Sequence, residues 1–158
     1  NSRWFDEQLE IFRHIYIGIG KALGDQGLIV PVLNHVQSMD LENIAAGLAD
    51  LIGRARENKL KPEVVRGGTF TISNHGVSGS LVATPIIIHQ PQSAILGVGK
   101  IEKRIKILEA NGEDVIAIRP MCYISLTIDH RAIDAFQTNA FLTEVVETLE
   151  NWPQAAKA

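Results

Sequence analysis

The chain has 158 residues, a length that fits one compact domain. Hydrophobic residues make up 46% of it and charged residues 21%, so we expect a substantial core. The net charge of −3 argues against nucleic acid as the main partner, because phosphate binding needs clustered Lys and Arg. The one dense basic stretch, 100–106, is short, and we expect it to form the solvated side of a strand pair. No apolar segment is long enough to span a membrane, and the charged start does not resemble a signal peptide.

The only cysteine is Cys122, which lies within an apolar run. One cysteine forms no disulfide within the chain, so a reducing compartment is expected, either the bacterial cytoplasm or the mitochondrial matrix. We expect Cys122 to be a buried small hydrophobic residue rather than a catalytic thiol.

The first predicted elements are strands. Residues 14–20 alternate between apolar and other side chains, with the isoleucines at Ile15, Ile17 and Ile19. Residues 24–27, GDQG, have the composition of a turn. Residues 27–33 are apolar and β-branched, but Pro31 has no amide hydrogen to donate to a strand ladder. This segment is therefore predicted to be an edge strand or a bulged strand.

A helix is predicted over residues 39–58. Its apolar residues recur at helical spacing, and they are Leu41, Ile44, Ala45, Leu48, Ile52 and Ala55. Ser38 or Asp40 is the expected N-cap. Pro62 prevents the helix from continuing.

The next elements are strands with short connections. Residues 67–80 predict a short strand followed by a loop rich in Gly and Ser. Residues 91–99 predict a buried strand. Residues 105–120 predict a hairpin, because Asn111-Gly112 is a strong signal for a tight turn.

The last elements are a strongly apolar strand at 121–128 and a helix from Asp134 to about Glu150. One face of this helix is expected to be apolar, through Phe136, Ala140, Phe141, Val145 and Leu149. Residues 153–158 are expected to form a frayed tail. The order of strands and helices predicts an α/β fold, a two-layer sandwich with a mixed sheet.

His130 is the first candidate for chemistry. It follows a buried strand, and imidazole is the usual general base near neutral pH. Asp134, four residues on, could orient the loop, and Asp129 and Arg131 could form an ion pair across the turn. The spacing alone favours a second interpretation, in which Asp134 is only the N-cap of the last helix and His130 is a surface residue.

Ser73 begins the second candidate, the loop SNHGVSGS at 73–80. Its small residues allow backbone to approach a ligand closely, and its hydroxyls could donate to a developing oxyanion. The alternative interpretation is an ordinary turn.

The remaining polar residues carry weaker signals. Four histidines are scattered without metal-ligand spacing and without a Cys or carboxylate cluster, so no metal site is predicted: His14, His35, His75 and His89. The sequence contains no GxGxxG, no P-loop and no GxSxG. Three carboxylates bracket the predicted hairpin turn and are expected to be solvated, namely Glu109, Glu113 and Asp114.

Several stretches together resemble one family, the dihydrolipoamide acyltransferases that form the core of 2-oxo acid dehydrogenase complexes. The segment DHRAIDA (129–135) is similar to that family's DHRxxDG signature. Four further matches occur in the family's order, and they are GLIVPVL with RARENKLKP, GGTFTISN, TPIIIHQPQSAILGVG and RPMCYISLTIDHR. The resemblance covers about residues 15–152.

The resemblance implies a fold like that of chloramphenicol acetyltransferase. It also implies transfer of an acyl group between a lipoyl-lysine arm and coenzyme A, both of them substrates, with no metal. In that family the motif histidine is the general base on the attacking thiol, which corresponds here to His130. A hydroxyl corresponding to Ser73 donates to the oxyanion, and an acidic residue corresponding to Asp134 holds the histidine loop.

The resemblance also implies partners. The family forms trimers with the active site between subunits, so His130 of one chain would face Ser73 of the next. Trimers assemble into cubic or dodecahedral cores that work with decarboxylase and dihydrolipoamide dehydrogenase components. No nucleic acid and no membrane is expected.

Three departures from the family pattern stand out. Ala135 replaces the motif glycine, which matters if the position needs positive φ. The segment His89-Gln90-Pro91 replaces Asn-Pro-Pro. The opening third of the family's catalytic domain has no match, so residues 1–152 are expected to be the C-terminal part of such a domain.

Three functions therefore stay open. The first is an acyltransferase, with acetyl, succinyl or branched-chain groups possible and the loop at 73–88 closer to the succinyl-transferring members. The second is a non-catalytic assembly module that keeps the trimer interface. The third is a different coenzyme-A acyltransferase of the same fold, which the Asp-His-Arg start of the motif disfavours.

Overall fold

The structure is a computed structural model, and it describes residues 1–24 and 27–153. Short 3-10 helices accompany the strands and α-helices, among them Val36–Ser38, Pro62–Val65 and Gly76–Ser78. The strands are β1 (Ser2–Phe5), β2 (Gln8–Ile11), β3 (Ile17–Ile19), β4 (Lys21–Ala22), β5 (Leu28–Ile29), β6 (Val32–Leu33), β7 (Phe70–Asn74), β8 (Ala94–Val98), β9 (Glu102–Ala110), β10 (Glu113–Met121) and β11 (Ile124–Ile128). The two α-helices are α1 (Leu41–Arg56) and α2 (Ala135–Glu150).

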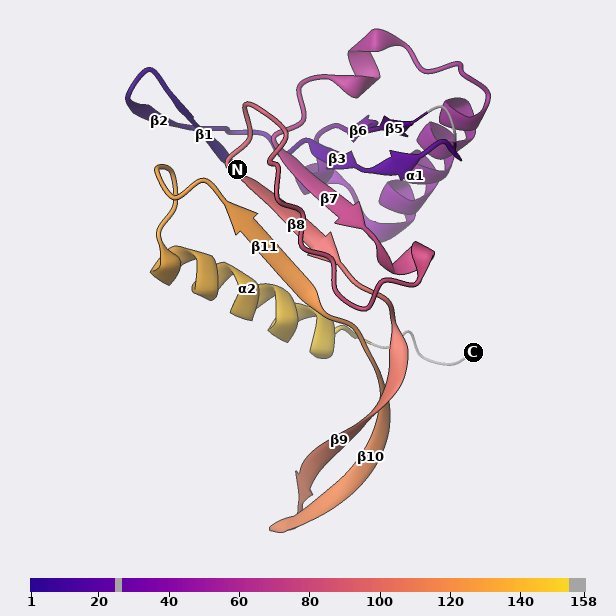
Figure 1. The fold of residues 1–158 in the computed structure, drawn as a ribbon, viewed down its shortest axis with the longest axis vertical. Coiled ribbons are helices and arrows are strands. Elements are labelled where there is room, and N and C mark those ends of the chain that lie inside the picture. Colours follow the sequence, from indigo (N-terminus) through magenta and orange to yellow (C-terminus); the bar gives the residue numbers. More distant parts are fainter. Residues whose placement is uncertain (25–26, 154–158) are drawn as a thin grey trace.

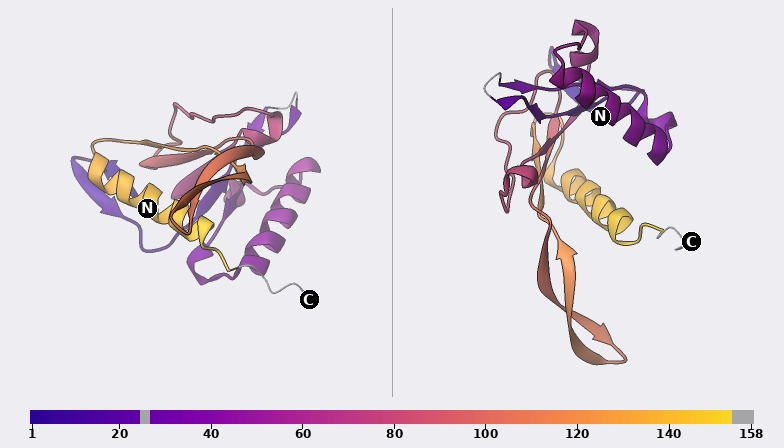
Figure 2. Two further views of the ribbon diagram at one scale, coloured as in Figure 1. Left: turned by 90° about the horizontal axis from the view of Figure 1, so that it is seen from below. Right: turned by 90° about the vertical axis from the view of Figure 1, so that its right-hand side faces the viewer.

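A five-stranded sheet forms the centre of the molecule, in the order β11-β8-β7-β3-β6 (Figure 1). The inner pairs β8–β7 and β7–β3 are parallel, whereas β11 and β6 run antiparallel to their neighbours at the two edges. Both α-helices lie on the same side of this sheet (Figure 2). The predicted two-layer α/β fold with a mixed sheet is therefore confirmed.

The two faces of the sheet differ in chemistry because successive side chains point to opposite sides of a strand. Register places Ile72, Leu96 and Leu126 side by side on the face that carries the helices. The next position along each strand belongs to the opposite face, where Ser73 and Ser125 flank Gly97. The polar candidate Ser73 thus points away from the helices.

The segment around Ala83 and Pro85 covers part of this second face. The Ser125 hydroxyl donates to the Ala83 carbonyl, and the Thr127 hydroxyl donates to the Pro85 carbonyl at 2.5 Å. A Cβ at Gly97 would overlap Ala83 and Pro85, so glycine lets this segment lie directly on the strand. Backbone outside the sheet is thereby held next to β8 and β11.

Helix α1 begins where the sequence predicts. The Asp40 carboxylate accepts the Asn43 amide hydrogen at 2.7 Å, which identifies Asp40 rather than Ser38 as the N-cap. Leu51 and Ala55 are the buried residues of the helix, whereas Leu41 is largely exposed. The predicted stripe is therefore correct at Ala55 but missed Leu51.

The segment with Pro31 forms the far edge of the sheet, as predicted. The chain breaks into β5 and β6 around Pro31, which is fully buried. Strand β6 pairs only with β3 in the central sheet. The predicted turn at 24–27 includes residues 25–26, which lie outside the described residues.

Strands β9 and β10 form a long hairpin that projects away from the sheet (Figures 1 and 2). Asn111 and Gly112 both have positive φ at its tip, as a tight two-residue turn requires. The predicted hairpin is confirmed, and Glu109, Glu113 and Asp114 are exposed as expected. We call this hairpin, residues 102–121, the arm.

One face of the arm is apolar and uncovered. Register pairs Ile105 with Ile118 and Ile107 with Ile116, and all four side chains are between 62% and 73% exposed. The prediction that the basic residues of 100–106 are solvated is confirmed for Lys100 and Lys103, which are exposed. It is wrong for Arg104 and Lys106, which are half-buried.

Cys122 is exposed, so the prediction that it is buried is wrong. The apolar run at 121–128 is not one continuous strand. Cys122 and Tyr123 link the end of the arm to β11, and only residues from Ile124 onward enter the sheet. The strand expected from residue 121 therefore starts at Ile124, and its five residues are half-buried rather than buried.

Helix α2 packs on the sheet through only part of its predicted apolar face. Phe141 contacts Phe70 edge to face, with ring centroids 6.1 Å apart. Phe136 and Leu149 are exposed instead. The β1–β2 hairpin at the start of the chain has no counterpart among the sequence predictions. Neither described helix is long and apolar enough to cross a membrane.

Replacement of Leu51 by Ala tests the packing of α1. Leu51 is 4% exposed, so Leu51→Ala is expected to lower the free energy of unfolding by about 2–5 kcal/mol. Leu41 is 60% exposed in the same helix, and Leu41→Ala should change the stability by no more than about 0.5 kcal/mol. Urea unfolding of both variants measures the difference, and equal losses would contradict this packing.

Candidate functional site

Strand β7 positions Ser73 near the end of the central sheet. Ser73 pairs with Gly97 on β8, and its hydroxyl lies beside Gly20. A Cβ built on Gly20 would lie 3.7 Å from the Ser73 Oγ, so no side chain crowds the hydroxyl from that side. The half-buried hydroxyl is thus held on rigid backbone with space next to it.

His75 contacts Ser73 directly, a contact that the sequence did not predict. The His75 Nε2 atom and the Ser73 Oγ atom are 3.0 Å apart. The turn that follows is tight: the Gly76 amide donates to the Asn74 side chain at 2.9 Å, and the Ser78 amide donates to the His75 carbonyl. The loop after β7 is therefore a defined turn that brings an imidazole against the candidate hydroxyl.

His130 lies in the turn after β11 and is exposed. The turn is held by Asp129, whose amide donates to the Ser93 carbonyl at 2.8 Å and whose carbonyl accepts the Ala132 amide at 2.9 Å. Arg131 donates to the Asp129 carboxylate through Nε at 3.0 Å and Nη2 at 2.7 Å. The predicted ion pair across the histidine is confirmed.

This ion pair shifts both partners' pKa values. Hydrogen bonds from the Arg131 side chain hold the pKa of Asp129 below its ordinary value, although partial burial opposes this. The Asp129 carboxylate correspondingly raises the pKa of Arg131. The residues before and after His130 in the sequence are therefore a carboxylate and a guanidinium that are charged and paired with each other at neutral pH.

Asp134 is the N-cap of α2. Its carboxylate accepts the Gln137 amide hydrogen at 2.8 Å, and its carbonyl accepts the Thr138 hydroxyl at 2.6 Å. Its carboxylate oxygens therefore hold the first turn of the helix and fix where the His130 turn ends. The interpretation of Asp134 as a helix cap is confirmed.

Ala135 is the first residue of α2, and its φ is not positive. An L-residue adopts that helical conformation without strain. The concern that alanine at this motif position distorts the histidine turn is thereby removed.

Ser73 and His130 do not meet within one chain. Register places Ser73, Gly97 and Ser125 at one level across three strands. His130 lies five residues beyond Ser125 along β11, so the two candidates are separated by roughly 15 Å or more. They leave the sheet at opposite ends, because β11 runs antiparallel to β7 and β8.

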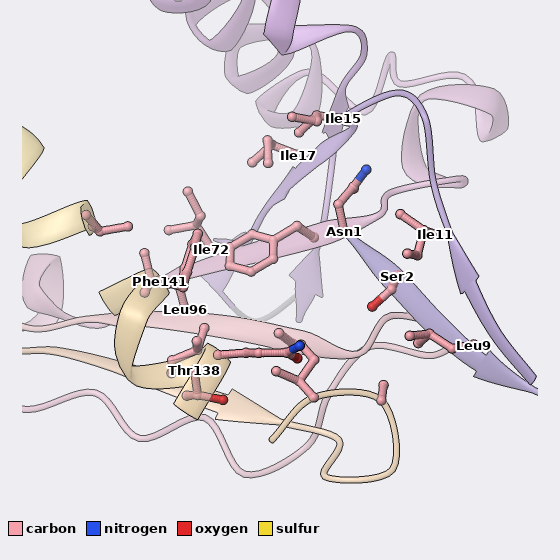
Figure 3. A pocket seen from close by; sticks show the side chains of 17 residues that line it. Asn1, Ser2, Leu9, Ile11, Ile15, Ile17, Ile72, Leu96, Thr138 and Phe141 are labelled. Atoms are coloured by element: carbon pink, nitrogen blue, oxygen red, sulfur yellow. The ribbon is translucent and has the colours of Figure 1, made fainter. Parts of the chain in front are cut away.

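A hollow lies on the helix side of the sheet, between the strands and α2 (Figure 3). Its volume is about 610 Å³. Most of its lining is aliphatic or aromatic, including Leu9, Ile11, Ile17, Ile72, Leu96 and Phe141. Ser73 points to the other face, so this hollow is separate from the Ser73 hydroxyl.

No metal centre is formed by the part of the chain that the structure describes. Within residues 1–24 and 27–153, no group of three or more His, Cys, Asp or Glu side chains is placed to hold an ion. Of the candidate residues, the His130 imidazole is of a type that can accept a proton, and the Ser73 hydroxyl is of a type that can donate a hydrogen bond.

Comparison with protein-family models matches residues 1–156 to the catalytic domain of the 2-oxoacid dehydrogenase acyltransferases. The acetyltransferase component of the Mycobacterium bovis pyruvate dehydrogenase complex is 43% identical over 152 residues, 95% of this chain and 27% of that protein. The succinyltransferase component of the Pseudomonas aeruginosa 2-oxoglutarate dehydrogenase complex is 45% identical over 143 residues, 90% of this chain and 34% of that protein. The chain thus spans about a third or less of these relatives.

Solved structures give the same result. A probable dihydrolipoamide acetyltransferase from Listeria monocytogenes has a TM-score of 0.88 and 34% identity, over 99% of this chain and 64% of that one. The Azotobacter vinelandii dihydrolipoamide acetyltransferase, studied for the catalytic roles of a serine, a histidine and an asparagine, has a TM-score of 0.86 and 33% identity, over 96% and 60%. A cubic core of the pyruvate dehydrogenase complex also has a TM-score of 0.86, with 32% identity, over 96% and 60%.

Two substitutions of Asp134 distinguish the contribution of its capping hydrogen bond to stability from the contribution of its negative charge. Asp134→Ala removes the acceptor of the Gln137 amide and is expected to lower the free energy of unfolding by about 1 kcal/mol. Asp134→Asn should stay within about 0.3 kcal/mol of the wild type, because Asn caps helices as well as Asp does. Chemical denaturation measures both, and an equal loss in the two variants would show that the carboxylate charge, not the cap, matters.

Proposed function

Because the chain belongs to the 2-oxoacid dehydrogenase acyltransferase family, we propose that it transfers an acyl group between dihydrolipoamide and coenzyme A. His130 acts as the general base and Ser73 as the oxyanion donor. The observation that carries the proposal is the rigid presentation of both groups: His130 on a turn locked by Asp129 and Arg131, and Ser73 on a central strand.

The reaction needs one base and one hydrogen-bond donor. His130 accepts the proton of the attacking thiol, whose pKa of about 8.5 otherwise leaves it mostly protonated at neutral pH. The sulfur bonds to the thioester carbonyl carbon, and the carbonyl π electrons move to oxygen. Ser73 donates a hydrogen bond to that oxyanion. When the carbonyl re-forms, the original carbon–sulfur bond breaks, and His130 returns the proton to the departing thiolate.

The separation of Ser73 and His130 within one chain supports a site made by two copies. Neither residue alone supplies both functions, and a cubic core is known for a relative with the same fold. We therefore place His130 of one copy opposite Ser73 of the next. In a closed cyclic trimer this contact repeats three times, so every copy contributes both residues.

The arm supports association with further copies. An isolated two-stranded hairpin is marginally stable in water, and this one exposes four isoleucines on one face. A second copy of the chain is the occupant we propose for that face, in keeping with the cubic core formed by a relative. Both the catalytic function and a purely structural role in a core need this contact.

The acyl group is proposed from the loop after β7. Relatives that transfer acetyl and relatives that transfer succinyl are similarly close, at 43% and 45% identity. The composition of residues 73–88 is nearer to the succinyl-transferring members, so we propose succinyl. Initial rates with succinyl-coenzyme A and acetyl-coenzyme A compare the two, and a preference for acetyl would overturn this part of the proposal.

Loss of His130 tests the general base. His130→Ala is expected to lower the rate of acyl transfer from acyl-coenzyme A to dihydrolipoamide by about 100-fold or more, with the assembly unchanged in size. His14→Ala is the matched control, since His14 is exposed on another segment of the chain. Transfer that persists in His130→Ala would exclude His130 as the base. A wild-type assembly with no transfer at all would instead favour the assembly-module alternative.

Mixed assemblies test whether two copies share each site. His130→Ala chains and Ser73→Ala chains are each expected to be nearly inactive. Random co-assembly after joint unfolding and refolding should recover about one quarter of wild-type activity, because that share of interfaces pairs an intact histidine with an intact serine. If the mixture is no more active than the separate variants, the site lies within a single copy.

A further inference from the structure

His75 is a polar group that the proposed reaction leaves without a role. It stands two residues after Ser73, at the end of β7, and its Nε2 atom lies 3.0 Å from the Ser73 Oγ atom. Among the residues that the structure describes, no other side chain hydrogen-bonds this hydroxyl. This contact is therefore the one side-chain hydrogen bond within the described residues that can orient the Ser73 hydroxyl.

His75 is exposed, but the backbone on both sides of it is held in place. The His75 amide donates to the Val98 carbonyl at 3.0 Å, and the His75 carbonyl accepts from both the amide and the hydroxyl of Ser78. A Cβ at Gly76 would overlap the backbone of Gly99 and Lys100, so the turn lies directly on the strand end. The turn thus fixes the backbone position from which the imidazole reaches the Ser73 hydroxyl.

The direction of the hydrogen bond decides what Ser73 can do. A serine hydroxyl has one proton and can also accept. If His75 accepts that proton, the proton is no longer available to an oxyanion. If His75 donates from Nε2, the hydroxyl oxygen is held in one rotamer and its proton stays free to point at the reacting carbonyl oxygen.

We propose that His75 is a positioning residue for Ser73: its Nε2–H donates to the Ser73 Oγ and directs the hydroxyl proton toward the oxyanion. This inference rests on the proposed acyl transfer and adds to it the residue that orients the donor. His75 itself does not touch the reacting atoms. Its effect is expected in kcat, because a donor that is oriented for the oxyanion acts mainly in the transition state.

Two nearly isosteric substitutions separate the directions of the bond. In His75→Gln the side-chain amide can still donate to the Ser73 Oγ, whereas the carboxylate of His75→Glu only accepts. We expect His75→Gln to keep kcat within about threefold of the wild type, and His75→Glu and His75→Leu to lower it by about tenfold, with KM little changed. This loss is smaller than the ~100-fold expected when the donor itself is removed in Ser73→Ala.

The same His75 substitutions, made in the Ser73→Ala background, show whether the loss of kcat acts through the Ser73 hydroxyl. If His75 acts through Ser73, then His75→Glu and His75→Leu have no further effect on kcat there. Equal losses in both backgrounds would overturn the proposal, because a general effect of charge or folding does not need the hydroxyl. A Gln variant that is as impaired as the Glu variant would overturn it too.

A spectroscopic readout keeps this inference distinct from the proposed function. The ¹⁵N shift of the His75 Nε2 nucleus, assigned by its disappearance in His75→Gln, should move when Ser73 is replaced by Ala. An unchanged shift would show that His75 does not contact Ser73 in solution, and it would overturn the inference even if the wild type transfers acyl groups normally. A chain with the shift change but no transfer in any assembly would overturn the proposed function, and the positioning role with it.

Discussion

The pairing of β11 with β8 is the constraint on which the arrangement of the molecule depends. Strand β8 has a parallel neighbour, β7, on one side and an antiparallel neighbour, β11, on the other. The chain can reverse in this way because the arm carries it outward and back between β8 and β11. As a consequence Ser73 leaves the sheet at one end and His130 at the other, and a single copy keeps them apart.

The same constraint explains why the local structure around each candidate is so fully hydrogen-bonded. A group that must meet its counterpart on another copy has to be held in place before the copies meet, since flexibility would be lost again on association. Asp129 and Arg131 hold the His130 turn, Asp134 ends it, and the turn after β7 holds Ser73 beside His75. Each half of the proposed site is thus pre-organised within its own chain.

Elements with strong local signals were predictable from the sequence. Asn111-Gly112 predicted the turn at the tip of the arm, and Asp40 and Asp134 predicted where the two α-helices begin. The β1–β2 hairpin was missed because its turn residues, Asp6 and Glu7, adopt positive φ without a glycine to signal it. Cys122 was misplaced because an apolar run does not show where a chain passes from one sheet to another.

The candidate site was predictable in identity but not in arrangement. The resemblance to a family indicated His130, Asp134 and Ser73, and local spacing left both a catalytic and a structural interpretation open. The distance between Ser73 and His130 depends on strand order, which periodicity does not reveal. The contact of His75 with Ser73 depends on how the chain turns after β7, so a histidine without metal-ligand spacing gave no signal.

The central claim is that two copies complete one site. The most direct measurement is a cryo-electron microscopy structure of the assembled particle with coenzyme A bound. We expect His130 of one copy and Ser73 of its neighbour to lie on either side of the coenzyme A thiol, each within hydrogen-bonding reach of the reacting group. A particle in which the thiol lies far from His130, or in which no neighbour's Ser73 faces that histidine, would contradict it.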